Sequence, residues 1–175
     1  GINNNQKLIN IFKNDYDYQK ASLILLDTIK NNENICILGD YDVDGTCATS
    51  LLVRYFNHIN QKYFFYIPDR VNDGYGASKK LFQKLILKEP KLVIMVDCGS
   101  TSNEAVDYLN KHNIKSIIID HHEINKPYPK SDVIINPKKE LVYNENSFLC
   151  ATALTYFFVD ILIKKTKSNF KISNF

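Results

Sequence analysis

Residues 35–45 read ICILGDYDVDG: four apolar residues, then three aspartates at alternate positions, ending in a glycine. The apolar run has the length and the isoleucine content of a buried strand. The spacing of apolar residues after Gly45 predicts a helix over about residues 46–58, and Gly45 permits a tight turn into it. A strand that leads through a turn into a helix is the repeating unit of an α/β fold.

The same alternation of apolar runs and helical patterns continues along the chain. Strands are expected at Ile35–Leu38, Tyr63–Ile67, Leu92–Val96, Ser116–Ile119 and Val133–Ile135, and helices at about 17–30, 46–58, 78–88, 102–112 and 148–165. Strands that alternate with helices predict an α/β fold with a mainly parallel sheet and helices on both of its faces. Residues 1–175 contain no internal repeat and have the length of one domain.

The composition is that of an ordinary globular protein, with 45% hydrophobic and 23% charged residues. No stretch approaches the roughly 20 apolar residues of a membrane span, so we expect neither a secretory leader nor a membrane partner. The four cysteines are widely spaced and favour a reduced, cytoplasmic setting over a disulfide framework or a zinc site. The net charge of +3 is too small to indicate nucleic-acid binding by itself.

Polar residues gather where the expected strands end. The clusters are Asp40–Asp44, Asp69–Arg70, Asp97, Asp120–Glu123 and Asn136–Lys138, one after each strand. The carboxyl ends of parallel strands form the ligand crevice of an open α/β sheet, so we expect these side chains at one edge. Crowded carboxylates raise one another's pKa unless a cation lies between them. The pattern therefore indicates a metal site, with a solvated acidic turn as the alternative for residues 39–45.

The D-x-D-x-D-G stretch also matches the start of a calcium-binding EF-hand loop. Counted from Asp40, position 12 of that loop would be Leu51 instead of glutamate, and a strand-like run precedes it instead of a helix. Both differences exclude the calcium loop. The chain also lacks the G-x-S-x-G elbow of serine hydrolases and the glycine-rich loops that bind nucleotide phosphates.

Two further motifs carry candidate ligands. In VDCGS (96–100), Asp97 directly follows an apolar run and is either a helix cap or a ligand between two cations. In IDHHE (119–123), His121 is a candidate ligand that an adjacent carboxylate would orient. An oxygen-rich site with one or two imidazoles suits Mn²⁺ or Mg²⁺.

The segment IPDRVNDGYG (67–76) admits two interpretations. It is either a well-made turn, which its Asp-Gly and Tyr-Gly pairs support, or a contact to phosphate or substrate. In the second case Arg70, or backbone amides near Gly74 and Gly76, would make the contact. The sequence alone leaves both open.

The motifs GDYDVDG, VDCGS and IDHHE, in this order and at these spacings, resemble those of the DHH phosphoesterase superfamily. The form DYDVDG and the IPDR and DGYG pieces of the third segment resemble its RecJ branch, the exonucleases specific for single strands. The likeness extends over about residues 15–162. It implies a Rossmann-like, three-layer DHH domain that hydrolyses phosphodiester bonds in single-stranded DNA from the 5′ end, using two Mn²⁺ or Mg²⁺ ions. DNA repair and recombination would be its setting, and a single-strand-binding protein an expected partner.

The resemblance also implies a role for each motif residue. Asp40 and Asp42 would bind one cation and Asp44 with His121 the second, while Asp97 would bridge the two. Asp120 would hold His121, and His122 would face the scissile phosphate. The implied catalytic residues are thus Asp97, Asp120, His121 and His122, and the implied substrate contacts are Arg70, Gly74, Tyr75, Gly76 and His122.

The sequence departs from the family pattern in two places. Relatives supply another metal-binding aspartate, and a DHHA1 domain that closes the substrate cleft, beyond the point where this chain ends at Phe175, so we expect the first half of a longer enzyme. Gly76 is followed by Ala-Ser where many relatives have asparagine. Two alternatives stay open: a relative acting on oligoribonucleotides, cyclic dinucleotides or pyrophosphate, whose first motif usually begins with histidine in place of Asp40, and a non-catalytic DNA-binding module without metals.

Overall fold

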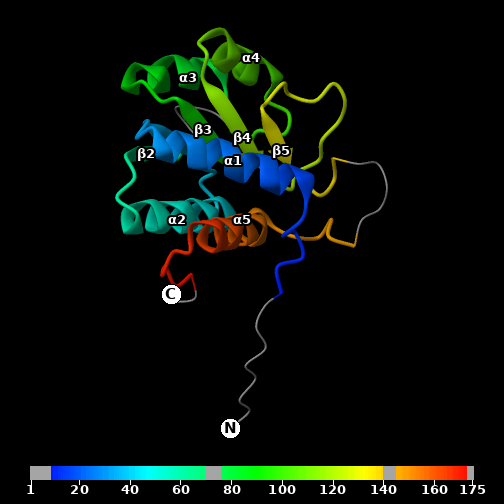
Figure 1. Ribbon diagram of the computed structural model, residues 1–175. Helices are drawn as coiled ribbons and strands as arrows, with labels where there is room; N and C mark the ends of the chain where they lie inside the picture. Colours follow the sequence, from blue (N-terminus) through cyan, green and yellow to red (C-terminus); the bar gives the residue numbers. More distant parts are fainter. Residues whose placement is uncertain (1–8, 70–75, 140–144, 173–175) are drawn as a thin grey trace.

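The fold is a five-stranded parallel sheet between two layers of helices (Figure 1). A computed structural model describes residues 9–69, 76–139 and 145–172. The strands are β1 (Ile35–Leu38), β2 (Tyr63–Tyr66), β3 (Leu92–Val96), β4 (Lys115–Ile119) and β5 (Val133–Ile135). The helices are α1 (Tyr16–Lys30), α2 (Val43–His58), α3 (Lys79–Leu85) with a 3₁₀ turn η1 (Ile86–Lys88), α4 (Asn103–Lys111) and α5 (Ala151–Thr166). The predicted α/β fold is confirmed, and β1, β3 and β5 have the predicted bounds.

Alternate residues of the central strands pack into opposite cores. In β1, Ile35 and Ile37 contact the layer formed by α1, α2 and α5, whereas Cys36 and Leu38 contact the layer formed by α3 and α4. The other central strands alternate in the same way, and β1, β3 and β4 are almost wholly buried. Both faces of a parallel sheet are covered, which explains why its strands read as continuous apolar runs.

The strand order is β2-β1-β3-β4-β5, with every pair parallel. The chain leaves β1 toward β2 on one side and then returns to place β3 on the other side of β1. The order of the strands therefore reverses between β1 and β3, and such a switch point is where open α/β sheets form their ligand crevice. The acidic turn after β1 and Asp97 after β3 lie at this point.

Helix α2 begins at Val43, three residues before the predicted start. Asp42 is its N-cap, and the side chain of Asp42 accepts a hydrogen bond from the backbone N–H of Gly45 at 2.8 Å. Asp44 and Gly45 consequently lie in the first helical turn and not in a loop. The reason for the difference is that a capping aspartate compensates for the poor helix propensity of glycine.

Gly45 permits a close approach of backbones, not the tight turn expected from the sequence. A Cβ at this position would lie 2.6 Å from the carbonyl oxygen and 2.7 Å from the nitrogen of Asp40. The first turn of α2 can therefore pack directly on the backbone of Asp40 only if residue 45 has no side chain.

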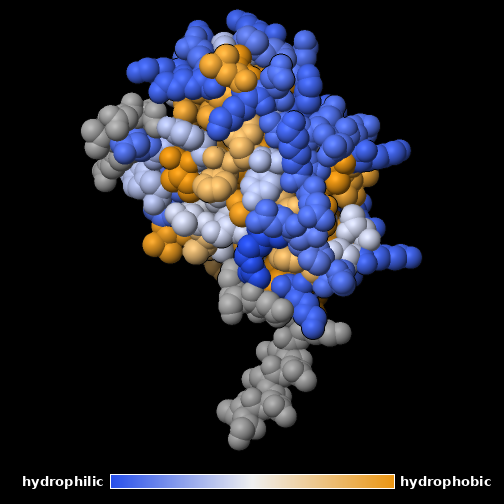
Figure 2. All heavy atoms as spheres, turned by 90° about the vertical axis from the view of Figure 1, so that its left-hand side faces the viewer, coloured by the Kyte–Doolittle hydropathy of each residue, from blue (hydrophilic) through white to orange (hydrophobic). Residues whose placement is uncertain are grey.

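The side of the molecule that carries the β2 edge shows hydrophobic patches among hydrophilic residues (Figure 2). Phe65 of β2 is 52% exposed, and a cavity of about 420 Å³ lined by Val53, Phe65 and Ile67 opens beside it. In the described parts of the chain, none of the helices is both long and apolar enough to cross a membrane.

Replacing Gly45 with alanine should destabilise the fold, although alanine normally favours helices over glycine. Because the added Cβ would meet backbone atoms of Asp40, we expect a loss of about 1–3 kcal/mol in the free energy of unfolding. Urea denaturation of Gly45→Ala measures it, with Cys47→Ala at an exposed position of the same helix as the control. A Gly45→Ala protein as stable as the wild type would contradict the close-approach role.

Candidate metal centre

Asp97 is the most deeply buried acid at the switch point. Its side chain has no solvent exposure, and its backbone has a φ of 60°, a left-handed conformation that aspartate and asparagine adopt more readily than most residues. Its amide donates to Ile119 in β4, which continues the ladder between β3 and β4 by one residue. The backbone thus fixes where this carboxylate lies.

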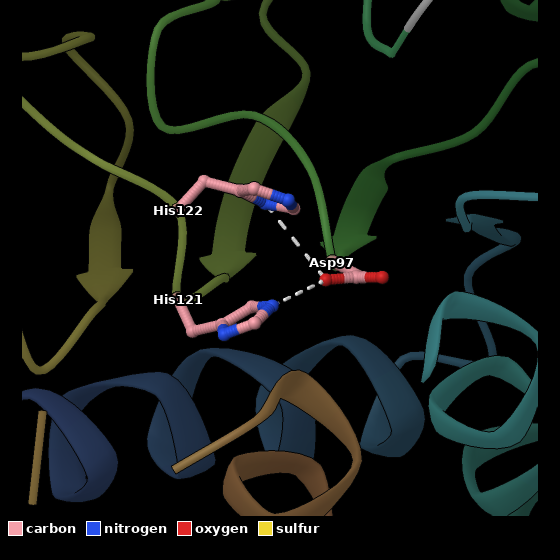
Figure 3. Close-up of side chains that lie close together, drawn as sticks. All are labelled: Asp97, His121 and His122. Atoms are coloured by element: carbon pink, nitrogen blue, oxygen red, sulfur yellow. Dashed lines mark ion pairs between the residues drawn. The ribbon is translucent and has the colours of Figure 1, made fainter. Parts of the chain in front are cut away.

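The carboxylate of Asp97 accepts no hydrogen bond from the described residues on either oxygen. Nε2 of His121 lies 3.1 Å from Oδ1 of Asp97, close enough for an ion pair but outside hydrogen-bond geometry, and Nδ1 of His122 lies 3.8 Å from the same oxygen. Figure 3 shows both rings directed at one oxygen, while the other oxygen points away from them. A buried carboxylate left in this state is costly unless a cation is present.

Two groups of potential ligands share Asp97. One consists of Asp97, His121 and His122, and the other of Asp40, Asp42 and Asp97; within each group the ligand atoms lie within 4.8 Å of one another. The structure therefore brings together loops that are far apart in the sequence. A carboxylate common to two groups has the position that a bridging ligand needs.

Asp40 is buried and Asp42 is exposed, although they are two residues apart. Oδ1 of Asp40 accepts a hydrogen bond from the amide of Tyr41 at 2.8 Å, while Asp42 caps α2. Burial, together with the charges of Asp42 and Asp120, raises the pKa of Asp40 above its usual range. Each carboxylate keeps acceptor capacity beyond its one hydrogen bond.

Asp120 binds the ring of His122 and the backbone amide of His121, whereas the resemblance implied only that it holds His121 in place. Oδ1 of Asp120 accepts from Nδ1 of His122 at 2.7 Å and from the backbone amides of both histidines. Oδ2 accepts from the amide of Ser100 at 3.0 Å. Burial favours a raised pKa for Asp120, but the hydrogen bonds from Ser100 and His122 outweigh it and lower the pKa. Asp120 is therefore an ionised anchor for the His122 imidazole.

Asn136 completes this network and carried no assigned role in the sequence motifs. Its side-chain amide donates to Oγ of Ser100 at 2.8 Å and to the carbonyl of His122 at 3.0 Å. Its Oδ1 accepts from the amide of Lys138 at 2.9 Å. Asn136 thereby ties the end of β5 to the loops after β3 and β4. Its place in the polar cluster after the fifth strand was the only sequence signal that could have found it.

Asp44 is held by the start of α5. Its Oδ2 accepts from the amide of Ala151 and its Oδ1 from the amide of Thr152, both at 2.8 Å. Oδ2 of Asp44 also lies 3.5 Å from Nε2 of His121. Burial acts to raise the pKa of Asp44, but the hydrogen bonds from Thr152 and Ala151 prevail and hold the pKa below its ordinary value.

A cavity of about 380 Å³ opens beside His122 between the starts of α3 and α4. Its lining includes Gly76, Ser100, Asn103 and Asp120. Gly76, a predicted substrate contact, is buried with a φ of 68°. It lies near the candidate centre because it lines this cavity together with His122. His122, also predicted as a contact, lines the same cavity, while the predicted contacts Arg70, Gly74 and Tyr75 lie outside the described residues.

The electrostatics of the centre favour a bound cation. Burial and the negative charges of Asp44, Asp42 and Asp120 raise the pKa of Asp97 to about 8. The donor atoms gathered around it are carboxylate oxygens and imidazole nitrogens, a set that suits Mn²⁺ or Mg²⁺. The unsatisfied oxygens of Asp97 are the feature that fits a divalent ion.

The chain resembles known proteins in sequence. Residues 34–174 match the family model described as "DHH family, N-terminal domain". The chain is 33% identical over 121 residues to the single-stranded-DNA-specific exonuclease RecJ of Bacillus subtilis, an alignment that covers 69% of this chain. The chain spans only 15% of the length of that relative, and 25% of a RecJ from Dickeya dadantii.

Solved structures show the same fold. A crystal structure of exonuclease RecJ bound to manganese matches with a TM-score of 0.78 at 24% identity, over 86% of this chain and 38% of the other. The Mn²⁺ complex of RecJ from Thermus thermophilus matches with a TM-score of 0.73 at 21% identity, over 87% of this chain and 21% of the other. The parallel sheet, the acids at its switch point and the family match over most of the chain lead to one conclusion: this chain belongs to the DHH family.

Proposed function

We propose that this chain forms the metal-binding part of an exonuclease of RecJ type, which hydrolyses phosphodiester bonds in single-stranded DNA from the 5′ end. The observation that carries the proposal is the buried carboxylate of Asp97, which accepts no hydrogen bond from the described residues and is shared by two groups of ligands. The RecJ structures that share its fold contain manganese or magnesium, so both ions are candidates here.

The residues of the chain would divide the work as follows. Asp40 and Asp42 would hold one cation, Asp44 and His121 would hold the second, and Asp97 would be a ligand of both. When bound, the two cations would lower the pKa of a water molecule and neutralise charge on the phosphate. Asp120 fixes the ring of His122 through Nδ1, and in this proposal the fixed ring would face the scissile phosphate.

The polymer specificity rests on the relatives. Proteins named as RecJ or as single-strand-specific exonucleases match this chain at 29–33% identity. The cavity beside His122 has the volume to accept part of a nucleotide next to the metal ligands. The proposal also places the enzyme in DNA repair and recombination, where it would process DNA ends together with a single-strand-binding protein. It further includes a second part of the enzyme downstream of this domain.

The metal-free chain should lose stability as the pH rises. The pKa of Asp97 is about 8 in the folded chain, against an ordinary value near 3.8. Between about pH 4 and about pH 8 the folded state therefore keeps a proton on Asp97 that the unfolded state has released. The penalty is absent below about pH 4 and grows by at most about 1.4 kcal/mol per pH unit up to about pH 8. Asp97→Asn removes this penalty, so in chelator the variant should exceed the wild type in stability, increasingly so toward pH 8.

Urea unfolding at several pH values measures the difference, with Asp107→Asn on the exposed face of α4 as the control. Saturating Mn²⁺ should reverse the order by stabilising only the wild type. An Asp97→Asn chain that is no more stable than the wild type at any pH would show that Asp97 is not the strained acid of this site.

The proposed polarity can be tested with end-labelled single-stranded DNA and Mn²⁺, using the longer protein in which we propose that this domain lies. A 5′ label should appear in mononucleotides from the first time points, whereas a 3′ label should remain in long fragments. Asp97→Asn should lower the rate at least about hundredfold. Hydrolysis of cyclic dinucleotides or pyrophosphate, with the DNA left intact, would instead establish the small-phosphate alternative.

The proposed role of Arg70 predicts a change in salt dependence. If Arg70 contacts a DNA phosphate, Arg70→Ala should weaken binding of single-stranded DNA and reduce the slope of log affinity against log salt concentration by about 0.7. Fluorescence anisotropy over a salt series measures both, with Arg54→Ala in α2 as the control arginine. An unchanged slope would remove Arg70 from the substrate contacts.

A further inference from the structure

Helix α5 begins without a cap of its own. Its N-cap residue, Cys150, makes no side-chain capping hydrogen bond. The amides of Ala151 and Thr152, the first two residues of the helix, donate instead to the two oxygens of Asp44, more than 100 residues earlier in the chain. The first amides of a helix need acceptors, and a carboxylate also complements the positive end of the helix dipole. Asp44 therefore serves as the cap of α5 although it belongs to α2.

Thr152 holds Asp44 at a second point. Its Oγ1 donates to the backbone carbonyl of Asp44 at 3.0 Å, while its amide binds the carboxylate. Thr152 therefore hydrogen-bonds both the backbone and the side chain of Asp44. These contacts hold the Asp44 side chain in the rotamer that places Oδ2 3.5 Å from Nε2 of His121.

These hydrogen bonds leave Asp44 able to bind a cation. A carboxylate has about four acceptor sites, and the hydrogen bonds from the start of α5, one amide on each oxygen among them, use some of these. Oδ2 is the oxygen that lies beside His121. The contrast with Asp97 is clear, because Asp97 accepts no hydrogen bond from the described residues and is placed by its backbone alone.

We propose that Thr152 is a positioning residue of the metal centre, which uses the start of α5 to hold Asp44 toward His121. This inference rests on the proposed function, since it assigns Asp44 to a cation. Its consequence is that the packing of α5 on α2 sets the affinity of the second ion, so that a hydroxyl outside the acidic motifs controls metal binding.

The test compares Thr152→Val, which keeps the shape and the amide but removes the hydroxyl, with Thr152→Ser, which restores it. Thr166→Val is the matched control, because Oγ1 of Thr166 bonds Leu162 in the last turn of the same helix. Calorimetric titration of this chain with Mn²⁺ should show about a tenfold loss of affinity in Thr152→Val. Thr152→Ser and Thr166→Val should stay close to the wild type. Equal affinity in all four proteins would overturn the proposal, as would an equal loss in Thr152→Val and Thr166→Val.

A second measurement needs no metal. In chelator, hydrogen exchange of the Ala151 and Thr152 amides, followed by NMR, should become faster in Thr152→Val and in Asp44→Asn but not in Thr166→Val. Unchanged exchange in Thr152→Val would show that the hydroxyl does not hold Asp44. If the wild-type chain binds no Mn²⁺ while the exchange rates change as expected, the positioning contact stands and the proposed function loses its support.

Discussion

The buried carboxylate of Asp97 is the constraint around which the centre is built. It accepts no hydrogen bond from the described residues, it has no solvent exposure, and burial together with three other acids raises its pKa to about 8. A folded protein tolerates such a group only where something else compensates for it. Here the sheet itself enforces the arrangement, because the amide of Asp97 continues the ladder between β3 and β4.

The other acids of the centre differ from Asp97 in how completely they are satisfied. Asp120 and Asp44 accept several hydrogen bonds each, and their pKa values are lowered. These two acids are fixed and ionised before any cation arrives, which lets them orient His122 and face His121. The centre thus combines two anchored, ionised carboxylates with a third that accepts no hydrogen bond from the described residues and whose pKa is raised.

Much of the fold followed from local patterns. The apolar runs at β1, β3 and β5 have the predicted bounds because strands buried on both faces leave an uninterrupted apolar signature. The predicted start of α2 was wrong by three residues, because the capping hydrogen bond from Gly45 to Asp42 extends the helix into the acidic motif. The order of the strands could not be read from periodicity, since it depends on which strands pair across the sheet.

The sequence by itself determined which residues could form the centre: aspartates and histidines that directly follow apolar runs, because parallel strands carry their carboxyl ends to one edge. Only the tertiary structure decided what each of them does. Asp120 binds the ring of His122 and not that of His121, Asn136 joins three loops, and α5 holds Asp44. These contacts join residues up to 108 positions apart. Hydrogen-bond partners at that separation are chosen by the packing of helices and strands, and no local pattern encodes them.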